Sequence, residues 1–355
     1  MNVGIFFGTR PEIVKLSRLM FLSKQKYADE FSLIHTGQHY SYSMSGQFMD
    51  ELALPSIDYN LGIGSGTHNY QIGSMLLKLE RLIKEKDIDT MVILGDTNSA
   101  LAGALCANRS GIRVCHIEAG IRSFDRTMPE EINRILTDAV SNHCYAPTTI
   151  AVEHLKKENI SDDRIFLTGN VIVDALNYYL PLAKKRERII PDESYGLVTL
   201  HRPANVDRKE KLLELVNALN TISVDNGLPL YFPIHPRTRN NLEKFGLLKK
   251  IKLNLIDPLG YFDFLRAMSE SKIMITDSGG LQEESCILGV PCATIRENTE
   301  RPETVHIGSN YLCGTTYSGI VEGVNIMLNK KPDWKQPYGD GRSSERILNL
   351  IQTLN

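Results

Sequence analysis

Short apolar runs alternate with amphipathic stretches along the chain. The apolar runs have the length and the β-branched content of buried strands, and the stretches between them have helical spacing. This alternation is typical of βαβ units, in which helices cover a parallel sheet. The pattern therefore predicts an α/β fold.

The same rhythm occurs in both halves of the chain. In the first half, strands are predicted at residues 3–7, 32–35, 90–94, 113–117 and 165–168. Helices are predicted there at 11–23, 70–83 and 130–139. In the second half, strands are predicted at 196–200, 230–233, 272–276 and 292–295. Two similar domains follow from this repetition.

A charged run that ends in proline, residues 183–191, lies between the halves and is interpreted as a solvated linker. We expect two Rossmann-like, doubly wound domains that face each other across a cleft. The predicted boundaries are 1–172 and 173–340, with 341–355 as a C-terminal helix that returns toward the first domain. In such open sheets, ligands bind beyond the carboxyl ends of the strands.

Composition narrows the possible functions. With 355 residues, 42% hydrophobic and 23% charged, the chain can bury two cores, and its formal net charge of -2 argues against nucleic-acid binding. The apolar stretches are strand-sized, and the first of them is interpreted as a strand rather than a signal peptide. The six cysteines have no C-x-x-C spacing, which favours reduced core thiols. We expect a cytoplasmic protein with no membrane partner.

The first predicted turn, Gly8-Thr-Arg-Pro-Glu12, has the residues of a helix cap. Thr9 and Glu12 form a capping box, which leaves Arg10 and Lys15 as candidate anion-binding residues beside a helix N-terminus. The turn is not G-x-G-x-x-G, so a dinucleotide cofactor is not predicted.

Acidic residues follow the strands of the first domain. Asp96 and Glu118 each come at a strand's carboxyl end, and Glu130 and Glu131 open a helix. Helix capping would account for one of these carboxylates. A cluster of the others is suited to general acid and base catalysis. A divalent metal is the alternative, although no histidine stands at ligand spacing.

Two segments of the second domain carry candidate binding groups. Thr276-Asp-Ser-Gly-Gly-Leu-Gln-Glu-Glu284 follows a predicted strand and opens a helix, an arrangement that can bind a diphosphate. Glu283 and Glu284 can stabilise the helix dipole or accept ribose hydroxyls. His201 with Arg202, and His235 after the next strand, are the other candidates.

These segments together resemble the non-hydrolysing UDP-N-acetylglucosamine 2-epimerases, collinearly over nearly the whole chain. The matching stretches are GTRPE (8–12), TGQH (36–39), GDTN (95–98), HIEAGIRSFD (116–125), MPEEINR (128–134), GNVIVDAL (169–176), DSGGLQEE (277–284), TERPE (299–303) and PYGDG (337–341). DSGGxQEE followed by TERPE is the most specific pair.

The resemblance implies a GT-B fold, a homodimer, and UDP bound by the second domain. By position it assigns Ser278, Gly279 and Gly280 to the diphosphate, Glu284 to the ribose, and Phe264 with the backbone near Leu259 to uracil. It places Arg10, His201 and Arg301 near the diphosphate and sugar, and Lys15, Asp96, Glu118 and Glu130 at the reaction site.

The implied reaction interconverts UDP-GlcNAc and UDP-ManNAc without cofactor or metal, by elimination and return of UDP through 2-acetamidoglucal, for cell-surface polysaccharide synthesis. The alternatives are a related UDP-N-acetyl sugar (a diacetamido-uronate or a 6-deoxy sugar), a GT-B glycosyltransferase, and a UDP-sugar sensor. Pro203 and Ala204 stand where bacterial members usually have arginine and glutamate near an activating UDP-GlcNAc site. Activation by a second substrate molecule is therefore not expected.

Overall fold

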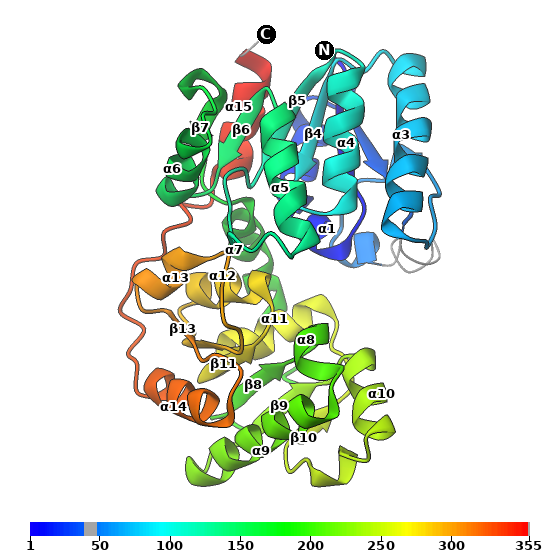
Figure 1. Ribbon diagram of the computed structural model, residues 1–355. Coiled ribbons are helices and arrows are strands. Elements are labelled where there is room, and N and C mark those ends of the chain that lie inside the picture. The colour runs from blue at the N-terminus through cyan, green and yellow to red at the C-terminus, as the bar shows by residue number, and fades with distance from the viewer. Residues whose placement is uncertain (39–47, 354–355) are drawn as a thin grey trace. The chain divides into compact units, whose positions relative to one another are not determined.

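The structure is a computed structural model that describes residues 1–38 and 48–353. The chain divides into two compact units, Met1–Ala175 with Tyr338–Asn355, and Leu176–Pro337. Each unit is a parallel sheet covered by helices, so the predicted α/β class is confirmed (Figure 1). In the described part of the chain, no helix is long and apolar enough to cross a membrane.

The sheet of the first unit has the strand order β3-β2-β1-β4-β5-β6-β7. Its strands are β1 (Val3–Phe7), β2 (Phe31–His35), β3 (Tyr59–Asn60), β4 (Thr90–Leu94), β5 (Arg113–Ile117), β6 (His143–Ala146) and β7 (Ile165–Leu167). All of them pair in parallel, and every residue of β1 and β4 is buried. Burial on both faces of the sheet explains why these two strands are continuous apolar runs rather than alternating ones.

Helices cover both faces of this sheet (Figure 1). They are α1 (Arg10–Lys26), α3 (His68–Glu85), α4 (Asn98–Arg109), α5 (Pro129–Val140), α6 (Thr149–Lys157) and α15 (Ser343–Thr353). A further helix, α7 (Val171–Ala183), begins in the first unit and ends in the second. Three of the helices, α3, α4 and α6, begin after a threonine whose hydroxyl accepts a backbone N–H of the first turn. α4 packs between α3 and α5, and α1 packs against α15.

The last helix is fixed to the first unit by one carboxylate. Asp174, in the first turn of α7, accepts the backbone N–H groups of Ser343 (3.1 Å) and Ser344 (2.8 Å) at the start of α15. These N–H groups have no partner within their own helix, so the carboxylate caps it. Asp174 thereby joins the start of α15 to the first turn of α7.

The second unit has six parallel strands in the order β10-β9-β8-β11-β12-β13, the Rossmann order. Its strands are β8 (Gly196–Thr199), β9 (Leu230–Pro233), β10 (Asn254–Ile256), β11 (Ile273–Thr276), β12 (Cys292–Thr294) and β13 (Asn310–Leu312). Its helices are α8 (Pro203–Val206), α9 (Lys209–Asp225), α10 (Pro236–Lys244), α11 (Tyr261–Glu270), α12 (Gly279–Leu288), α13 (Pro302–His306) and α14 (Tyr317–Leu328). α9 and α14 pack together over an apolar core beneath the sheet.

Most of the charged run at residues 183–191 is exposed, as predicted, but two of its arginines contact the second unit. The guanidinium of Arg186 lies 4.4 Å from the ring centre of Phe262, and Arg188 pairs with Glu270 at 3.0 Å. Both partners belong to α11, so the run packs along the second unit and the unit boundary falls inside α7. Cation–π and ionic contacts of this kind depend on α11 being nearby, which sequence composition does not reveal.

Candidate functional site

Three neighbouring strands of the first unit end in candidate side chains. β1, β4 and β5 lie side by side, and their carboxyl ends lead to Gly8–Lys15, Asp96 and Glu118 respectively. Since carboxyl ends of parallel strands share one edge of the sheet, the three segments meet there. The predicted grouping of Asp96 with Glu118 agrees with this topology.

Glu118 is paired with Lys15. The Nζ of Lys15 lies 2.5 Å from Oε1 of Glu118, and both residues are buried. Glu118 has a φ of 68°, a left-handed conformation that non-glycine residues rarely adopt. The carboxylate also approaches Gly95, whose absent Cβ would lie 3.6 Å from Oε2. Glu118 is thus fixed beside the loop that carries Asp96.

Asp96 is paired with Arg134, a residue that the sequence reasoning missed. The guanidinium of Arg134 donates to the Asp96 carboxylate and, at 2.8 Å, to Glu131. Asn133 donates from its amide to the Asp96 backbone carbonyl at 2.9 Å. α5 therefore fixes both the backbone and the charge of this loop. The sequence did contain a signal for Arg134, which follows the two glutamates of the MPEEINR segment by about one helical turn.

Glu131 has a structural role, as the sequence suggested for one of the two glutamates of α5. It accepts the backbone N–H groups of Ser123 and Phe124, each at 2.9 Å. Although partial burial raises the pKa of Glu131, these hydrogen bonds and Arg134 lower it overall. Glu130, its neighbour, is exposed on the first turn of α5.

The predicted capping box forms at the start of α1. Glu12 accepts the backbone N–H of Thr9 at 2.8 Å and the hydroxyls of Thr97 (3.0 Å) and Ser99 (3.1 Å). The same carboxylate therefore ties the first turn of α1 to the first turn of α4. Burial raises the pKa of Glu12, against the lowering effect of these hydrogen bonds.

Arg10 is exposed at the start of α1, as an anion-binding side chain requires. Its guanidinium carbon lies 5.4 Å from the ring centre of Phe48, a cation–π contact that the sequence did not indicate. His39 of the TGQH segment lies outside the described residues.

In the second unit, the carboxyl ends of β8 and β11 are joined by Asp277. This buried carboxylate accepts the backbone N–H groups of His201 (3.1 Å) and Arg202 (2.9 Å) and the amide of Asn205 (3.1 Å). His201 also places Nδ1 3.0 Å from Asp277. Burial raises the pKa of Asp277, but His201 together with the hydrogen bonds from Arg202 and Asn205 lowers the pKa overall.

His201 and His235 lie beside each other at the edge of the sheet, with ring centres 5.8 Å apart. The side chain of His201 is 43% exposed and can reach a ligand. His235 instead caps α10, where its Nδ1 accepts the N–H of Arg237 at 3.2 Å. Burial lowers the pKa of His235, and the nearby His201 lowers it further. His235 therefore has a capping role, whereas His201 contacts Asp277 and keeps part of its side chain exposed.

The first turn of α12 contains two glycines with different surroundings. Gly280 has space beside it for an anion, whereas Gly279 lies against the carboxylate of Glu300. A Cβ on Gly279 would lie 2.2 Å from Oε1 of Glu300, whereas one on Gly280 would meet nothing nearer than Glu284 at 3.9 Å. Glu300 is in turn held by Arg296 at 2.8 Å and lies 3.8 Å from Arg202. Ser278 is the N-cap residue and makes no side-chain capping bond. Cations thus gather around a helix N-terminus that itself favours an anion.

Arg301 and the two glutamates of α12 have different environments. Arg301 places Nε 2.6 Å from Oε1 of the fully buried Glu283. This contact settles the role of Glu283 as a structural partner of Arg301. Glu284 is half-buried, and its charge helps to raise the pKa of Tyr261 well above the ordinary value, after the larger effect of burial. Glu284 therefore remains the ribose candidate of the pair.

The candidate uracil residues lie at the β10–α11 connection. Leu259 is half-buried in the loop before α11, and Phe264 is half-buried on its first turn. Both belong to the carboxyl side of β10 in the sheet that also carries α12. An aromatic ring and exposed backbone groups at this edge suit a flat base with polar edges.

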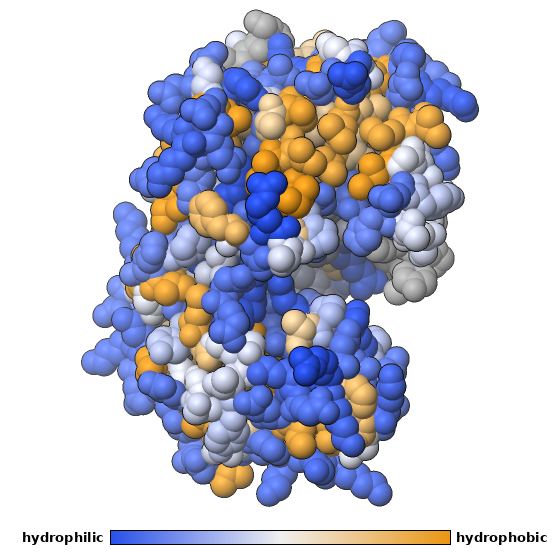
Figure 2. All heavy atoms as spheres, viewed as in Figure 1, coloured by the Kyte–Doolittle hydropathy of each residue, from blue (hydrophilic) through white to orange (hydrophobic). Residues whose placement is uncertain are grey.

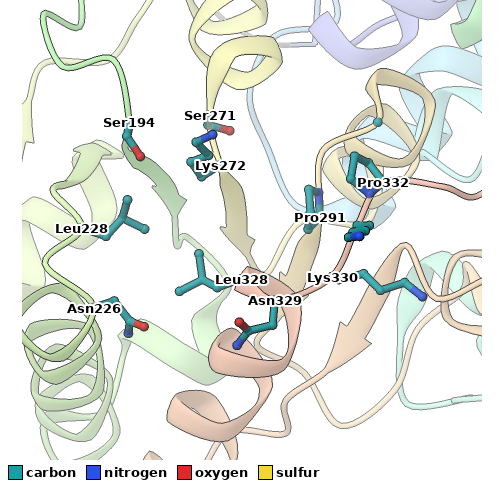
Figure 3. A pocket seen from close by; sticks show the side chains of 12 residues that line it. Ser194, Asn226, Leu228, Ser271, Lys272, Pro291, Leu328, Asn329, Lys330 and Pro332 are labelled. Atoms are coloured by element: carbon teal, nitrogen blue, oxygen red, sulfur yellow. The ribbon is translucent and has the colours of Figure 1, made fainter.

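A hollow of about 580 Å³ lies at the opposite edge of the second sheet (Figure 3). Its lining includes Lys272 before β11, Pro291 before β12 and Asn329 after α14. Several helices end here, and lysines there complement the negative ends of the helix dipoles. This hollow is therefore not part of the candidate site.

The described residues include the six cysteines and side chains of the types that can bind a metal ion. The six cysteines are free and buried, as predicted for core thiols. Among residues 1–38 and 48–353, no group of three or more histidine, cysteine, aspartate or glutamate side chains is placed to hold a metal ion. Glu118 and Asp96 are instead paired with Lys15 and Arg134.

Comparison with known proteins agrees with this geometry. The family model for UDP-N-acetylglucosamine 2-epimerase matches residues 23–352. A UDP-N-acetylglucosamine 2-epimerase of Methanocaldococcus jannaschii is 47% identical, with 99% of each chain covered. A UDP-2,3-diacetamido-2,3-dideoxy-D-glucuronate 2-epimerase of Pseudomonas aeruginosa is 38% identical, with 100% of each covered.

Solved structures show the same likeness. The crystal structure of the M. jannaschii UDP-GlcNAc 2-epimerase in complex with UDP-GlcNAc and UDP has a TM-score of 0.92 at 46% identity, with 99% of each chain covered. The likeness extends over both units and supports the predicted GT-B class. The chain is therefore an enzyme of the UDP-N-acetylglucosamine 2-epimerase family.

Proposed function

We propose that the protein interconverts UDP-GlcNAc and UDP-ManNAc by eliminating UDP and adding it back. The C2 hydrogen of the sugar is not α to a carbonyl, so its direct removal as a proton would be slow. Removal becomes feasible when the C1–oxygen bond to UDP breaks in the same stage. The electrons of the C2–H bond then form the C1–C2 double bond of 2-acetamidoglucal, and the proton goes to a base of the protein.

The reverse stage completes the epimerisation. A UDP oxygen adds to C1, the double-bond electrons take a proton at C2, and delivery to the opposite face inverts that carbon. The scheme needs a base, an acid and groups that stabilise the leaving diphosphate. UDP is released and recaptured, so atoms and charges balance without an oxidant.

The second unit is suited to hold UDP. The α12 N-terminus with Ser278, Gly279 and Gly280 offers N–H groups to the diphosphate, and Arg301 adds a positive charge. Glu284 would accept the ribose hydroxyls, and Leu259 and Phe264 would contact uracil. His201, 43% exposed, would donate to the diphosphate or the sugar.

The first unit is suited to move the proton. The observation that carries the proposal is the pairing of Glu118 with Lys15 and of Asp96 with Arg134 on adjacent loops. Two carboxylates held close to each other by separate cations give a base and an acid in one place. Glu130 is a third carboxylate on the same edge, and Arg10 an exposed cation for the departing diphosphate.

Incubation with UDP-GlcNAc alone in deuterated water tests the proposal. We expect deuterium at C2 in both UDP-GlcNAc and UDP-ManNAc, measured by NMR, with transient 2-acetamidoglucal and UDP in quenched samples. A glycosyltransferase or a UDP-sugar sensor would leave C2 unlabelled. A parallel assay after exhaustive chelation and without NAD should retain activity, and a loss restored by metal would contradict the proposed chemistry.

The substrate alternative is tested in the same assay. The P. aeruginosa relative is named for a diacetamido-uronate, whereas two methanogen relatives at 47% identity are named for UDP-N-acetylglucosamine. We therefore propose UDP-GlcNAc as the substrate. We also propose that the enzyme acts in the cytoplasm and that its product is used to make a surface polysaccharide. If the UDP-diacetamido-uronate takes up deuterium at C2 faster than UDP-GlcNAc, the diacetamido-uronate is the substrate. The expected lack of activation by a second UDP-GlcNAc stays a prediction.

We also propose that the protein forms a homodimer through the helical face of α3 and α4. Leu77 on α3 is 72% exposed, and Tyr70 on the same helix is 57% exposed. A groove of about 830 Å³ lies beside Leu77 and is lined by Leu76, Ile83 and Leu105. Figure 2 shows apolar side chains gathered on this part of the first unit. A second copy would bury this surface by a two-fold contact.

Leu77→Glu tests the dimer. We expect wild-type protein to sediment as a dimer and Leu77→Glu to shift toward monomer, because the charge would be buried at the contact. Val224→Glu is the matched control, since Val224 is 66% exposed on α9 of the second unit. A monomeric wild type, or equal effects of the two variants, would contradict this interface.

A further inference from the structure

A buried group of polar residues lies behind the two candidate carboxylates of the first unit. His116 on β5 is 0% exposed, and Asp138 on α5 is also 0% exposed. Nδ1 of His116 lies 2.6 Å from Oδ1 of Asp138. Neither residue is at the sheet edge with Glu118, so the acid–base scheme does not use them directly.

His116 reaches the loop that carries Asp96. Its Nε2 lies 2.8 Å from the backbone carbonyl oxygen of Gly95. A carbonyl oxygen only accepts, so Nε2 carries the hydrogen of this bond. Gly95 has a φ of 73°, which glycine adopts without strain, and it directly precedes Asp96. One ring nitrogen of His116 therefore holds the Asp96 loop.

Asp138 reaches the loop that carries Glu118. Its Oδ2 accepts the backbone N–H of Gly120 at 3.1 Å and the guanidinium of Arg122 at 2.6 Å. Arg122 is 1% exposed and is held from its other side by Glu158 at 2.7 Å. The loop from β5 to Gly120 is thus fixed on both sides of Glu118, by His116 before it and Asp138 after it.

The hydrogen bonds of His116 and Asp138 help to keep Glu118 in its unfavourable backbone conformation. A non-glycine residue at φ 68° persists only where its surroundings determine the conformation. Proton transfer to carbon depends steeply on where the carboxylate lies, and a 1 Å displacement can cost on the order of a hundredfold in rate. The loops that carry Asp96 and Glu118 are both held by the buried His116–Asp138 pair.

We propose that His116 and Asp138 are positioning residues for the C2 proton transfer, holding the Asp96 and Glu118 loops in register through Gly95 and Gly120. This inference rests on the proposed function, because it assigns that chemistry to the two carboxylates. It adds the residues that keep them placed. Neither His116 nor Asp138 touches the sugar in this scheme.

Substitutions of His116 can separate its two contacts. In His116→Gln the amide nitrogen can take the place of Nε2 and keep the bond to Gly95, while the bond to Asp138 is lost. In His116→Asn the shorter side chain can reach Asp138 but not Gly95. His116→Ala removes both. Leu79→Ala is the control for general destabilisation, since Leu79 is a fully buried core residue on α3.

The measurements are kcat and KM for epimerisation, C2 deuterium incorporation, calorimetric UDP affinity and thermal unfolding. We expect kcat and deuterium incorporation to fall by about a hundredfold in His116→Ala and by about tenfold in His116→Gln. KM and UDP affinity should change less than about threefold, because the UDP groups belong to the second unit. Leu79→Ala should lower the unfolding temperature but leave kcat per folded molecule unchanged.

Several results would overturn the positioning role. These are an unchanged kcat in folded His116→Ala, an equal kcat loss in Leu79→Ala at matched stability, or a loss confined to KM. If His116→Ala does not fold, the His116→Gln and His116→Asn variants carry the test, and wild-type rates in both contradict it. Absence of C2 labelling by the wild-type protein would instead refute the proposed function, which separates the two failures.

Discussion

Lys15 and Glu118 are 103 residues apart in the sequence, yet Nζ and Oε1 are separated by 2.5 Å in the interior of the first unit. The pair joins α1 to the end of β5. It holds a carboxylate charge at the sheet edge where few water molecules can solvate it.

Glu118→Gln should lower kcat by about a hundredfold, as expected for loss of a general acid or base. The substitution keeps the shape of the side chain, so calorimetric UDP affinity should change little. Glu153→Gln on α6 is the control, because Glu153 is exposed and belongs to neither the candidate site nor the proposed dimer face. A parallel fall of UDP affinity and kcat would make Glu118 a binding residue.

Asp96 and Arg134 should be energetically coupled. Asp96→Asn is expected to lower kcat by about a hundredfold. A double-mutant cycle with Arg134→Met should give a coupling of about 0.5–3 kcal/mol in the free energy of unfolding, because the two side chains share an ion pair. Urea denaturation of the four proteins measures it. Additive effects would show that the contact is energetically unimportant.

Glu283 should affect UDP binding through Arg301. If UDP binds as proposed, Arg301→Ala and Glu284→Ala each remove a charge-assisted hydrogen bond to it, so affinity should fall roughly ten- to a hundredfold. Glu283→Gln should weaken UDP binding in the same direction, since the buried partner of Arg301 loses its negative charge and then holds the guanidinium less firmly. Calorimetry checks this, with Glu322→Ala on the exposed side of α14 as control. Unchanged affinity in all three variants would refute the placement of UDP.

The two glycines of α12 should respond differently to alanine. Gly279→Ala places a Cβ 2.2 Å from Glu300, so that carboxylate and its partner Arg296 must move. We expect a lower unfolding temperature and weaker UDP binding. Gly280→Ala meets nothing closer than 3.9 Å and should fold like the wild type. Equal unfolding temperatures for the two variants would contradict the close contact at Gly279.

Asp277 should make the stability of the folded protein depend on pH in the acid range. Its pKa is lowered in the folded protein, so it contributes stability above the pKa of the unfolded chain, near 3.9. That contribution is lost as the pH falls through the lowered folded-state pKa. Urea denaturation from pH 6 downward should show a decline in stability that Asp277→Asn reduces. An identical pH slope in the variant would exclude Asp277 as the cause.

The sequence by itself determined the local elements wherever burial is complete. Strands predicted at 3–7, 90–94, 113–117 and 230–233 agree residue for residue with β1, β4, β5 and β9. β1 and β4 are buried along their whole length, and β5 is buried except for Arg113, because both faces of a parallel sheet are covered. The capping box of α1 was also readable, because its hydrogen bonds join residues three apart.

Weaker strands were missed for a physical reason. β6, β10 and β13 carry polar residues such as His143, Asn254 and Asn310, and β3 has only two residues. Short strands of mixed character gain their stability from neighbours in the sheet. Their pairing depends on strands far away in the sequence, which periodicity does not report.

Tertiary structure alone decided which charged groups meet. The carboxylates Asp96, Glu118 and Glu284 were found from their places after strands and in a helix. Their neighbours Arg134 and His116 were not, because each contact joins segments on different elements. Hydrogen bonds and ion pairs are set by distances of a few ångströms, and only the folded first unit brings those atoms together.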